Sequence, residues 1–329
     1  MGRTEKTGKT LGRNLLRVLD VVLFPFTLLS LLWMRAFRFA GPHRMPLTRR
    51  ACLRLSVWPL RDHFYDPQFH PRHLPRDYDR RERALAGLDL DVPFQLARLA
   101  DFDSADELRA LARDGAASGV RLDAANFGAG DSEYLYSVVR RFKPRRIFEI
   151  GSGNSSRVSL AALDKNAAED PARAGELVCI DPHAPAKLDA TRARVVRKRV
   201  EELGAGFFAE LDRNDVLFID SAHVIRPQGD VLFEFLELLP TLRPGVQIHV
   251  HDIYTPRDYP KELLVGRLSF WNEQYLLEAF LSGNRDFRVT GALNHLWHHH
   301  FEALAAKCPL LKSIPAARPG SFWFERRGL

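Results

Sequence analysis

Short apolar runs alternate with longer stretches of helical spacing along the chain after Asn126. The runs are rich in Val, Ile, Leu and Phe and have the length of buried strands. They predict strands at 147–150, 177–180, 194–200, 216–219 and 246–250. The intervening spacing predicts helices at about 154–163, 201–211 and 231–239. This alternation is typical of an α/β fold whose mostly parallel sheet is doubly wound, with helices on both faces.

The region before Asn126 has a different pattern. Residues 41–83 are rich in Pro, His and Arg and predict a loop-rich connector that lies over the next domain. Helical spacing follows at 92–99 and 105–112, the second opened by the capping pair Asp103-Ser104. We therefore expect an N-terminal arm at 1–45, a loop and helix extension at 46–125, and the sheet domain at 126–329.

Acidic residues end several of the predicted strands. Asp181, Asp220 and Asp252 each follow a strand directly or within two residues. In doubly wound sheets, ligands bind at the carboxyl ends of the strands, near the point where the strand order reverses. These side chains are therefore candidates for one shared binding site.

A glycine turn follows the first predicted strand. Gly151 and Gly153 allow a tight turn and a close approach to a ligand, and the next helix offers free N–H groups. A dinucleotide fingerprint requires Gly or Ala where this chain has Ser156. Glu149, two residues before the first glycine, would also add negative charge beside a pyrophosphate. The turn suits a ligand with a cationic or hydroxyl-rich head better.

The run Glu149-Ile-Gly151-Ser-Gly153-Asn-Ser155 resembles the first motif of the class I S-adenosylmethionine-dependent methyltransferases, with Ser155 where many members have Gly. The resemblance covers about residues 126–329 and implies a seven-stranded, Rossmann-like sheet whose final antiparallel strand lies at 321–324. It also implies that Glu149 and Gly151 line the methionine part of the cofactor and that Asp181 accepts the ribose hydroxyls. The cofactor-binding set would then be Glu149, Gly151, Ser152, Gly153, Asn154, Ser155 and Asp181.

A second group of candidates follows the fourth and fifth predicted strands. Asp220 and Asp252 would be neighbours in this fold, and two adjacent carboxylates repel each other unless they share a cation or a proton. Mg²⁺ or Mn²⁺ suits such oxygen ligands, with His251 as a third ligand. The arrangement is similar to the metal-dependent O-methyltransferases of the catechol and macrolide-sugar types. His223 is the candidate general base, and Asp220 is placed with it in the catalytic group.

Each candidate also has a structural explanation. Asp220 and Asp252 can be turn residues that cap helices, His223 can have a structural role, and His249 is expected to pack in the core. The cluster His295, His298, His299 and His300 has metal-ligand spacing, but a solvated helix face explains it better. Residues 271–275, together with Tyr254 and Asp258, are candidates for a substrate wall, although a helix start explains 271–275 equally well.

The distribution of charge along the chain argues against a nucleic-acid partner. The 329 residues carry 48 Lys+Arg and 41 Asp+Glu, a net of +7. Residues 1–76 hold 14 basic and 4 acidic side chains, so the remaining 253 residues are slightly acidic. A nucleic-acid-binding domain would carry its basic surface on the folded core. Three cysteines without a CxxC spacing indicate a reducing compartment.

The basic arm contains an uncharged apolar run at 21–34, flanked on both sides by Arg and Lys. Fourteen helical residues rise only about 21 Å, less than the roughly 30 Å hydrocarbon core, and Pro25 is expected to bend or interrupt the helix. No small-residue cleavage site follows the run, which argues against a signal peptide. An in-plane or shallow re-entrant membrane anchor over 14–40 is the preferred interpretation; a buried helix is the alternative.

These patterns predict a methyltransferase at the cytoplasmic face of a membrane that uses S-adenosylmethionine and a divalent cation. O-methylation of a small hydroxylated, glycan or lipid-linked acceptor is the favoured reaction. The alternatives are an NAD(P)-dependent oxidoreductase on the same sheet and a non-catalytic membrane adaptor with a methyltransferase fold. The oligomeric state does not follow from the sequence.

Overall fold

The computed structural model describes residues 2–57, 74–114, 119–314 and 316–328, with side chains from residue 17 onward. The chain forms two compact units. The larger unit comprises Arg76–Pro260 and Trp271–Leu329, and the smaller comprises Met1–Pro75 and Lys261–Phe270.

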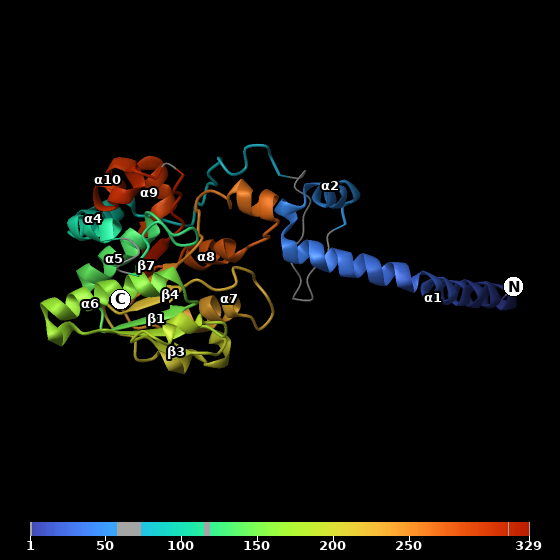
Figure 1. The fold of residues 1–329 in the computed structure, drawn as a ribbon, viewed down its shortest axis with the longest axis horizontal. Helices are drawn as coiled ribbons and strands as arrows, with labels where there is room; N and C mark the ends of the chain where they lie inside the picture. The colour runs from blue at the N-terminus through green and yellow to red at the C-terminus, as the bar shows by residue number, and fades with distance from the viewer. Residues whose placement is uncertain (1, 58–73, 115–118, 315, 329) are drawn as a thin grey trace. The chain divides into compact units, whose positions relative to one another are not determined.

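The larger unit is built on a seven-stranded sheet in the order β3-β2-β1-β4-β5-β7-β6 (Figure 1). The strands are β1 (Arg146–Ile150), β2 (Glu176–Ile180), β3 (Arg194–Val196), β4 (Val216–Ile219), β5 (Gln247–Val250), β6 (Phe287–Ala292) and β7 (Phe322–Arg326). The five strands β3, β2, β1, β4 and β5 run parallel to one another. Strand β7 runs antiparallel to both β5 and β6. The predicted fold class, a doubly wound, Rossmann-like sheet with an N-terminal helical extension, is confirmed.

Alternate residues of the strands pack into two apolar clusters, one on each face of the sheet. Ile147 contributes to the cluster that includes residues of α5 (Asp131–Phe142) and α6 (Asn154–Glu169). Its neighbour Phe148 contributes to the cluster that includes residues of α7 (Asp230–Phe233) and α8 (Glu273–Leu281). Because successive strand side chains point to opposite faces, both faces need helices to cover them.

Several predicted elements differ from those observed. The helix expected at 201–211 is replaced by two short 3₁₀ turns, Val200–Glu202 and Ala205–Phe208. Gly204 separates these turns with φ +69°, a conformation outside the helical region. The helix expected at 231–239 is mixed, since α7 passes into a π-helical turn and then a 3₁₀ turn. Strand β3 ends at Val196, short of the predicted 200, and β6 was not predicted.

The described residues at 76–114 and 119–125 belong to the same compact unit as the sheet. This region contains α3 (Val92–Ala100) and α4 (Ala105–Asp114). Leu99, Phe102 and Leu108 of this region are buried in the same cluster as the α5 and α6 side chains. The helix α10 (Phe301–Lys307) packs against α3 and against α9 (Leu293–His299). The unit boundary at Pro75 therefore differs from the expected divisions at 45 and 125.

The smaller unit contains one long helix, α1 (Gly2–Ala40), followed by α2 (Pro46–Leu55). The sequence predicted that Pro25 bends or interrupts the helix, and the structure shows no interruption, since α1 continues through it. Proline has no N–H to donate to the carbonyl four residues earlier, so the helix lacks that one hydrogen bond. The Arg49 guanidinium of α2 donates to the carbonyl of Val265, which belongs to the same unit.

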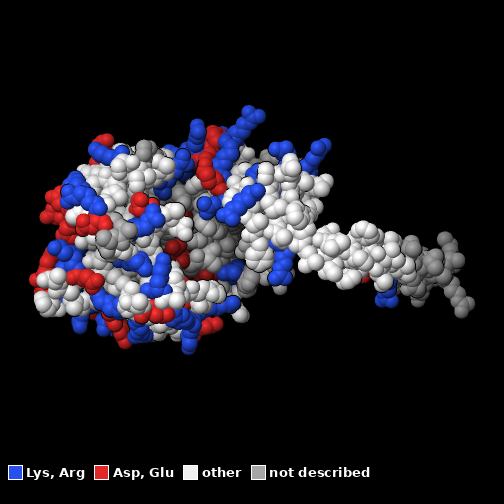
Figure 2. Space-filling view, viewed as in Figure 1, with Lys and Arg blue, Asp and Glu red and all other residues white. Residues whose placement is uncertain are grey.

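The segment Arg17–Ala40 of α1 has 24 residues and is long and apolar enough to cross a membrane. A signal sequence near an N-terminus can have the same length and composition. At 1.5 Å per residue this helix is about 36 Å long, more than the apolar run 21–34 alone suggested. Figure 2 shows the described part of α1 as a largely uncharged surface.

Candidate functional site

The site is built at the point where the strand order reverses between β1 and β4. Gly151 follows β1 with φ +84°, and its N–H donates to the carbonyl of Ile180 at 3.0 Å. A Cβ at Gly151 would lie 2.2 Å from the Asp220 carbonyl oxygen. The turn after β1 is therefore pressed against the residue that ends β4, and only glycine fits between them. This close approach places the two predicted groups of residues side by side.

Glu149 lies beneath the glycine turn and is 1 % exposed. One of its carboxylate oxygens accepts from the Ser155 hydroxyl at 2.5 Å, and the other accepts from the Cys179 thiol at 3.5 Å. Burial raises the pKa of Glu149 to about 7, even though these hydrogen bonds act in the opposite direction. The carboxylate supports the turn from below, and its direct contact with a cofactor stays a prediction.

Asp181 lies at the mouth of the same turn, directly after β2, and is partly exposed. It accepts from the Ser152 hydroxyl at 2.5 Å and from the backbone N–H of His183 at 2.7 Å. A carboxylate has about four acceptor positions, so two remain for hydroxyl donors. These contacts fix the orientation of the Asp181 carboxylate, and its contact with a ribose stays a prediction.

The remaining residues of the turn have two different roles. The Asn154 amide donates to the carbonyl of Phe127 at 3.0 Å and anchors the start of α6 to the preceding loop. The Ser156 hydroxyl accepts from the backbone N–H of Gly153 at 3.0 Å and closes the first turn of the helix. A Cβ at Gly153 would meet nothing within 4 Å, so this backbone faces open space. The turn therefore offers room for a ligand beside Gly153.

Asp220, His251 and Asp252 come together after β4 and β5. One ligand atom from each lies within 4.8 Å of the others. Nδ1 of His251 is 3.5 Å from Oδ1 of Asp220 and 3.7 Å from Oδ2 of Asp252. Two carboxylates and one imidazole are a donor set for Mg²⁺ or Mn²⁺. The two aspartates are partly exposed, which leaves access for an acceptor.

His251 is oriented by a residue that the sequence did not reveal. Asp131, at the start of α5, faces Nε2 of His251 at 3.6 Å and also accepts the backbone N–H groups of Gly320 and Ser321. A carboxylate on the far nitrogen fixes the ring so that Nδ1 faces the ligand position. Asp131 lies 120 residues before His251 and shares no motif with it. Only the tertiary structure brings the two together, through contacts of α5 with β7 and the residues just before it.

His223 is held over the same cluster. Its Nε2 is 3.3 Å from Oδ1 of Asp220 and 3.7 Å from Oδ2 of Asp252, and its Nδ1 is 2.8 Å from Oε2 of Glu273. The Trp271 ring packs on the imidazole with centroids 4.4 Å apart. Residues 271–275 are thus both a helix start and a wall of the site. Glu273, which the sequence analysis treated only as part of that wall, is the orienting partner of His223.

The backbone at His223 is in the left-handed region, with φ +59°. Its carbonyl accepts from the backbone N–H groups of Asn272 at 3.0 Å and Glu273 at 3.2 Å. Asp252 is also left-handed, with φ +57°. Non-glycine residues in this region are uncommon and carry strain, which surrounding contacts must offset. Here the contacts from the start of α8 hold His223 in place.

The charges of this cluster compensate one another. Burial alone would raise the pKa of Asp220, but the charges and hydrogen bonds of His251 and His223 lower it strongly. Burial alone would lower the pKa values of both histidines, but the surrounding carboxylates raise them well above the usual value. Where no cation is bound, the direction of these shifts favours the protonated form of both imidazoles. The role of His223 as a general base stays a prediction.

Other candidate residues lie around the cluster or in the core. His249 is fully buried and stacks on Phe218 with ring centroids 4.0 Å apart, so it packs in the core as expected. The Tyr254 hydroxyl donates to Oδ1 of Asp252 at 2.9 Å. Asp258 lies further out, where it accepts from the Tyr275 hydroxyl at 3.0 Å. Tyr254 therefore reaches the site directly, whereas Asp258 does not contact the aspartates.

The fold is Rossmann-like, and the candidate site lies at the switch point of its sheet. Residues 148–253 match a family model described as a methyltransferase domain. The matched segment begins in β1 and ends just after Asp252, so it includes the glycine turn, Asp181 and both aspartates of the cluster. The match supports a methyltransferase, and that class implies S-adenosylmethionine as the methyl donor. A search of curated proteins gave no match.

Proposed function

We propose that this protein transfers a methyl group from S-adenosylmethionine to a hydroxyl oxygen of a membrane-associated acceptor. The observation that carries the proposal is the contact between the Gly151 turn and Asp220, since it puts a cofactor turn directly beside a carboxylate–imidazole cluster. Methyl transfer is an in-line displacement, so it requires donor and acceptor sites that adjoin each other.

The residues of the turn fit the donor. Gly153 faces open space, and the free acceptor positions of Asp181 suit the two hydroxyls of a ribose. When bound, S-adenosylmethionine supplies an electrophilic methyl group on a sulfonium sulfur. The partly ionised carboxyl of Glu149 beneath the turn adds negative charge that favours such a cation. The chain's task is then to align the acceptor oxygen with that methyl group.

Asp220, His251 and Asp252 would hold a divalent cation. When bound, the cation would lower the pKa of an acceptor hydroxyl. In this reaction the C–S bond breaks, a C–O bond forms, and the hydroxyl proton must leave. His223 is placed to receive that proton at Nε2, while Glu273 holds Nδ1. A neutral His223 requires positive charge at the two aspartates, because those carboxylates help to raise its pKa.

We also propose that α1 attaches the protein to the cytoplasmic face of a membrane. Its exposed apolar side chains include Val21, Val22, Leu23 and Phe24, four successive positions that cover all sides of a helix. A helix lying in the membrane plane needs a polar face, which this segment lacks. Of the two anchors that the sequence favoured, in-plane or shallow re-entrant, entry into the hydrocarbon layer therefore fits α1 better than a position in the membrane plane. A membrane position in turn favours a lipid-linked or glycan acceptor.

Calorimetric titration of S-adenosylmethionine into the full-length protein in detergent tests the donor. We expect micromolar binding with chelator present, since the turn and Asp181 need no metal. Methyl transfer to lipid and glycan extracts is then measured with chelator and with Mg²⁺ or Mn²⁺, and we expect product only with cation. Gly153→Ala is the matched variant for the donor, because its Cβ enters the open space and leaves the fold unchanged.

The results separate the alternatives. Donor binding that Gly153→Ala weakens, together with cation-dependent product, supports the proposal. Binding of NADH without binding of S-adenosylmethionine would show an oxidoreductase instead. Donor binding without transfer to any extract would show an adaptor that keeps the fold. For membrane attachment, Leu28→Lys with Leu29→Lys is expected to release the protein from floated vesicles, and unchanged flotation would contradict insertion.

A further inference from the structure

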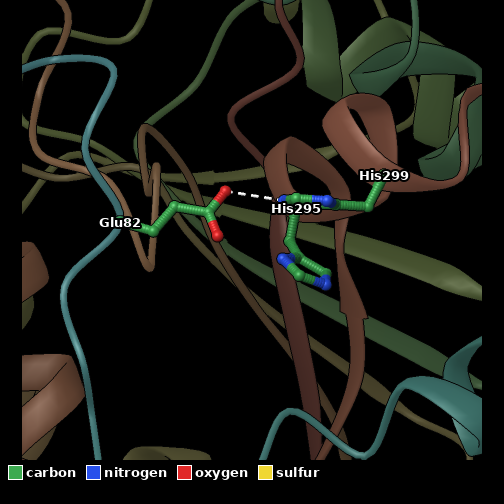
Figure 3. A group of neighbouring side chains, drawn as sticks. All are labelled: Glu82, His295 and His299. Carbon is green, nitrogen blue, oxygen red and sulfur yellow. Dashed lines mark hydrogen bonds and ion pairs between the residues drawn. The ribbon is translucent and has the colours of Figure 1, made fainter.

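A second group of possible metal ligands lies in the larger unit, away from the strand ends. It consists of Glu82, His295 and His299, whose ligand atoms lie within 4.8 Å of one another. Figure 3 shows a nitrogen of each imidazole facing the Glu82 carboxylate. The rings of His295 and His299 lie one beneath the other, with centroids 4.6 Å apart. The sequence pattern favoured a solvated helix face for these histidines, and it contained no sign of Glu82.

The spacing of residues on α9 brings two of the three possible ligands together. His295 and His299 are four residues apart on α9, so they lie on the same face of one helical turn. Glu82 comes from a different segment, which forms an isolated antiparallel bridge with Arg257. Three separate parts of the chain thus meet at this point: the segment at 82, the loop at 257 and α9.

The donor atoms are not all engaged with the protein. Nδ1 of His295 is buried and has no hydrogen-bond partner among the described residues. Nε2 of His299 is 2.6 Å from Oε1 of Glu82, and Nε of Arg257 donates to the same oxygen at 3.2 Å. Both of these contacts use Oε1, so the other carboxylate oxygen can take a cation while Arg257 keeps its bond. An unsatisfied buried nitrogen is costly, and a metal ion would satisfy it.

We propose that Glu82, His295 and His299 bind a divalent transition metal ion, with Zn²⁺ as the preferred ion. Two imidazoles and one carboxylate suit Zn²⁺ and Co²⁺ rather than Mg²⁺ or Ca²⁺. In a tetrahedral site with bonds of 2.0–2.1 Å, ligand atoms are about 3.3 Å apart. The His299–Glu82 contact of 2.6 Å is shorter than this spacing, and all the ligand atoms lie within 4.8 Å of one another. Small side-chain rotations would therefore bring them to it. Water would take the fourth position.

The ion would fix a segment that adjoins the proposed acceptor site. Arg83, next to Glu82, forms an ion pair with Glu278 of α8 and another with Asp258 at 3.1 Å. Asp258 belongs to the loop that begins at Asp252. The metal would therefore tie α9 to the segment and loop that border the cluster of Asp220, His251 and Asp252. Its binding does not depend on the proposed methyl transfer.

The test uses the full-length protein in detergent, stripped with chelator and titrated with Co²⁺ and then Zn²⁺. The background variant Asp252→Asn weakens the strand-end group, so that the second group is measured separately. We expect His295→Gln and His299→Gln to weaken Zn²⁺ binding at least about tenfold. His298→Gln is the matched control, since this exposed histidine lies on the same helix outside the group. We expect its affinity to stay within about twofold of the background.

Glu82→Gln provides a second measurement that does not alter the histidines. We expect Zn²⁺ to raise the melting temperature of the Asp252→Asn protein but not that of the variant that also carries Glu82→Gln. Loss of all Zn²⁺ binding in Asp252→Asn alone would overturn the proposal. Equal losses in His298→Gln and His299→Gln would also overturn it, because they would indicate adventitious binding to surface histidines.

Discussion

The two halves of the strand-end site are built from different chemistry. In the half formed after β1 and β2, carboxylates accept hydrogen bonds from neutral donors, as Glu149 does from Ser155 and Asp181 from Ser152. In the half formed after β4 and β5, carboxylates face imidazoles, and the charges of Asp220 and His251 depend on each other. The first half rests mainly on neutral hydrogen-bond donors, whereas the second is a cluster of carboxylates and imidazoles that shift one another's pKa values.

This difference would allow one sheet edge to hold the two proposed ligands. Neutral hydrogen-bond partners hold a carboxylate in place without using its charge, which remains available to a cofactor. A metal ion needs deprotonated ligands. A cation that binds to a cluster of paired carboxylates and imidazoles therefore displaces protons from those groups. We therefore expect substitutions in the first half to affect donor binding and substitutions in the second to affect the chemical step.

The largest expected effect comes from Asp252→Asn. The amide keeps the shape of the side chain but removes one of the two charges that hold the cation. We expect kcat/KM for methyl transfer to fall about 100-fold or more, with S-adenosylmethionine affinity unchanged. Steady-state kinetics and calorimetry on the same preparation measure both. A comparable loss of donor affinity would show that the two halves are not independent.

Gly151→Ala tests the contact that joins the halves. Its Cβ would meet the Asp220 carbonyl oxygen at 2.2 Å, and its φ of +84° strains any other residue. We expect the free energy of unfolding to fall by about 2 kcal/mol or more, and both donor binding and transfer to be lost. Gly153→Ala is the control, with a stability change within about 0.5 kcal/mol. Chemical denaturation compares them, and equal losses of stability would contradict the geometry at Gly151.

Asp181→Asn is expected to act on the first half alone. An amide oxygen accepts a hydroxyl less strongly than a carboxylate, so we expect donor affinity to fall about tenfold. Cation binding at Asp220 and Asp252 should not change. Calorimetric titrations with S-adenosylmethionine and with Mn²⁺ check the two expectations. An altered Mn²⁺ affinity would place Asp181 in the charge cluster instead.

The smallest effect is a pH dependence that Glu273→Gln shifts. The pKa values of His223 and His251 are raised in the folded protein, so their contribution to stability is complete below the unfolded value of about 6.5. That contribution is lost as the pH rises through the folded pKa values. We therefore expect the chelated protein to become less stable at alkaline pH.

Glu273→Gln removes one carboxylate that raises the pKa of His223, so the loss of stability should begin at lower pH. Thermal melts in chelator from acidic to alkaline pH measure the shift. Leu236→Gln, at an exposed position outside the site, is the control. A pH profile identical to that of the control variant would show that Glu273 does not set the protonation of His223.

The sequence predicted the parts of the fold that depend on local pattern. Strands β1, β2, β4 and β5 were predicted to within a residue at each end, because each is a buried run bounded by polar residues. The resemblance supplied the antiparallel β7. The predicted helix at 201–211 failed because Gly204 and the packing of Phe207 and Phe208 against Phe148 favour short turns. Helical spacing cannot distinguish such turns from a helix.

By itself, the sequence determined which residues end the strands, since the apolar runs and the polar residues after them are local. Only the tertiary structure decided what those residues meet. Asp131 reaches His251, Glu273 reaches His223 and Glu82 reaches His299 over separations of 120, 50 and 217 residues. The physical reason is that periodicity specifies which face a residue occupies, whereas the neighbours on that face depend on how distant elements pack.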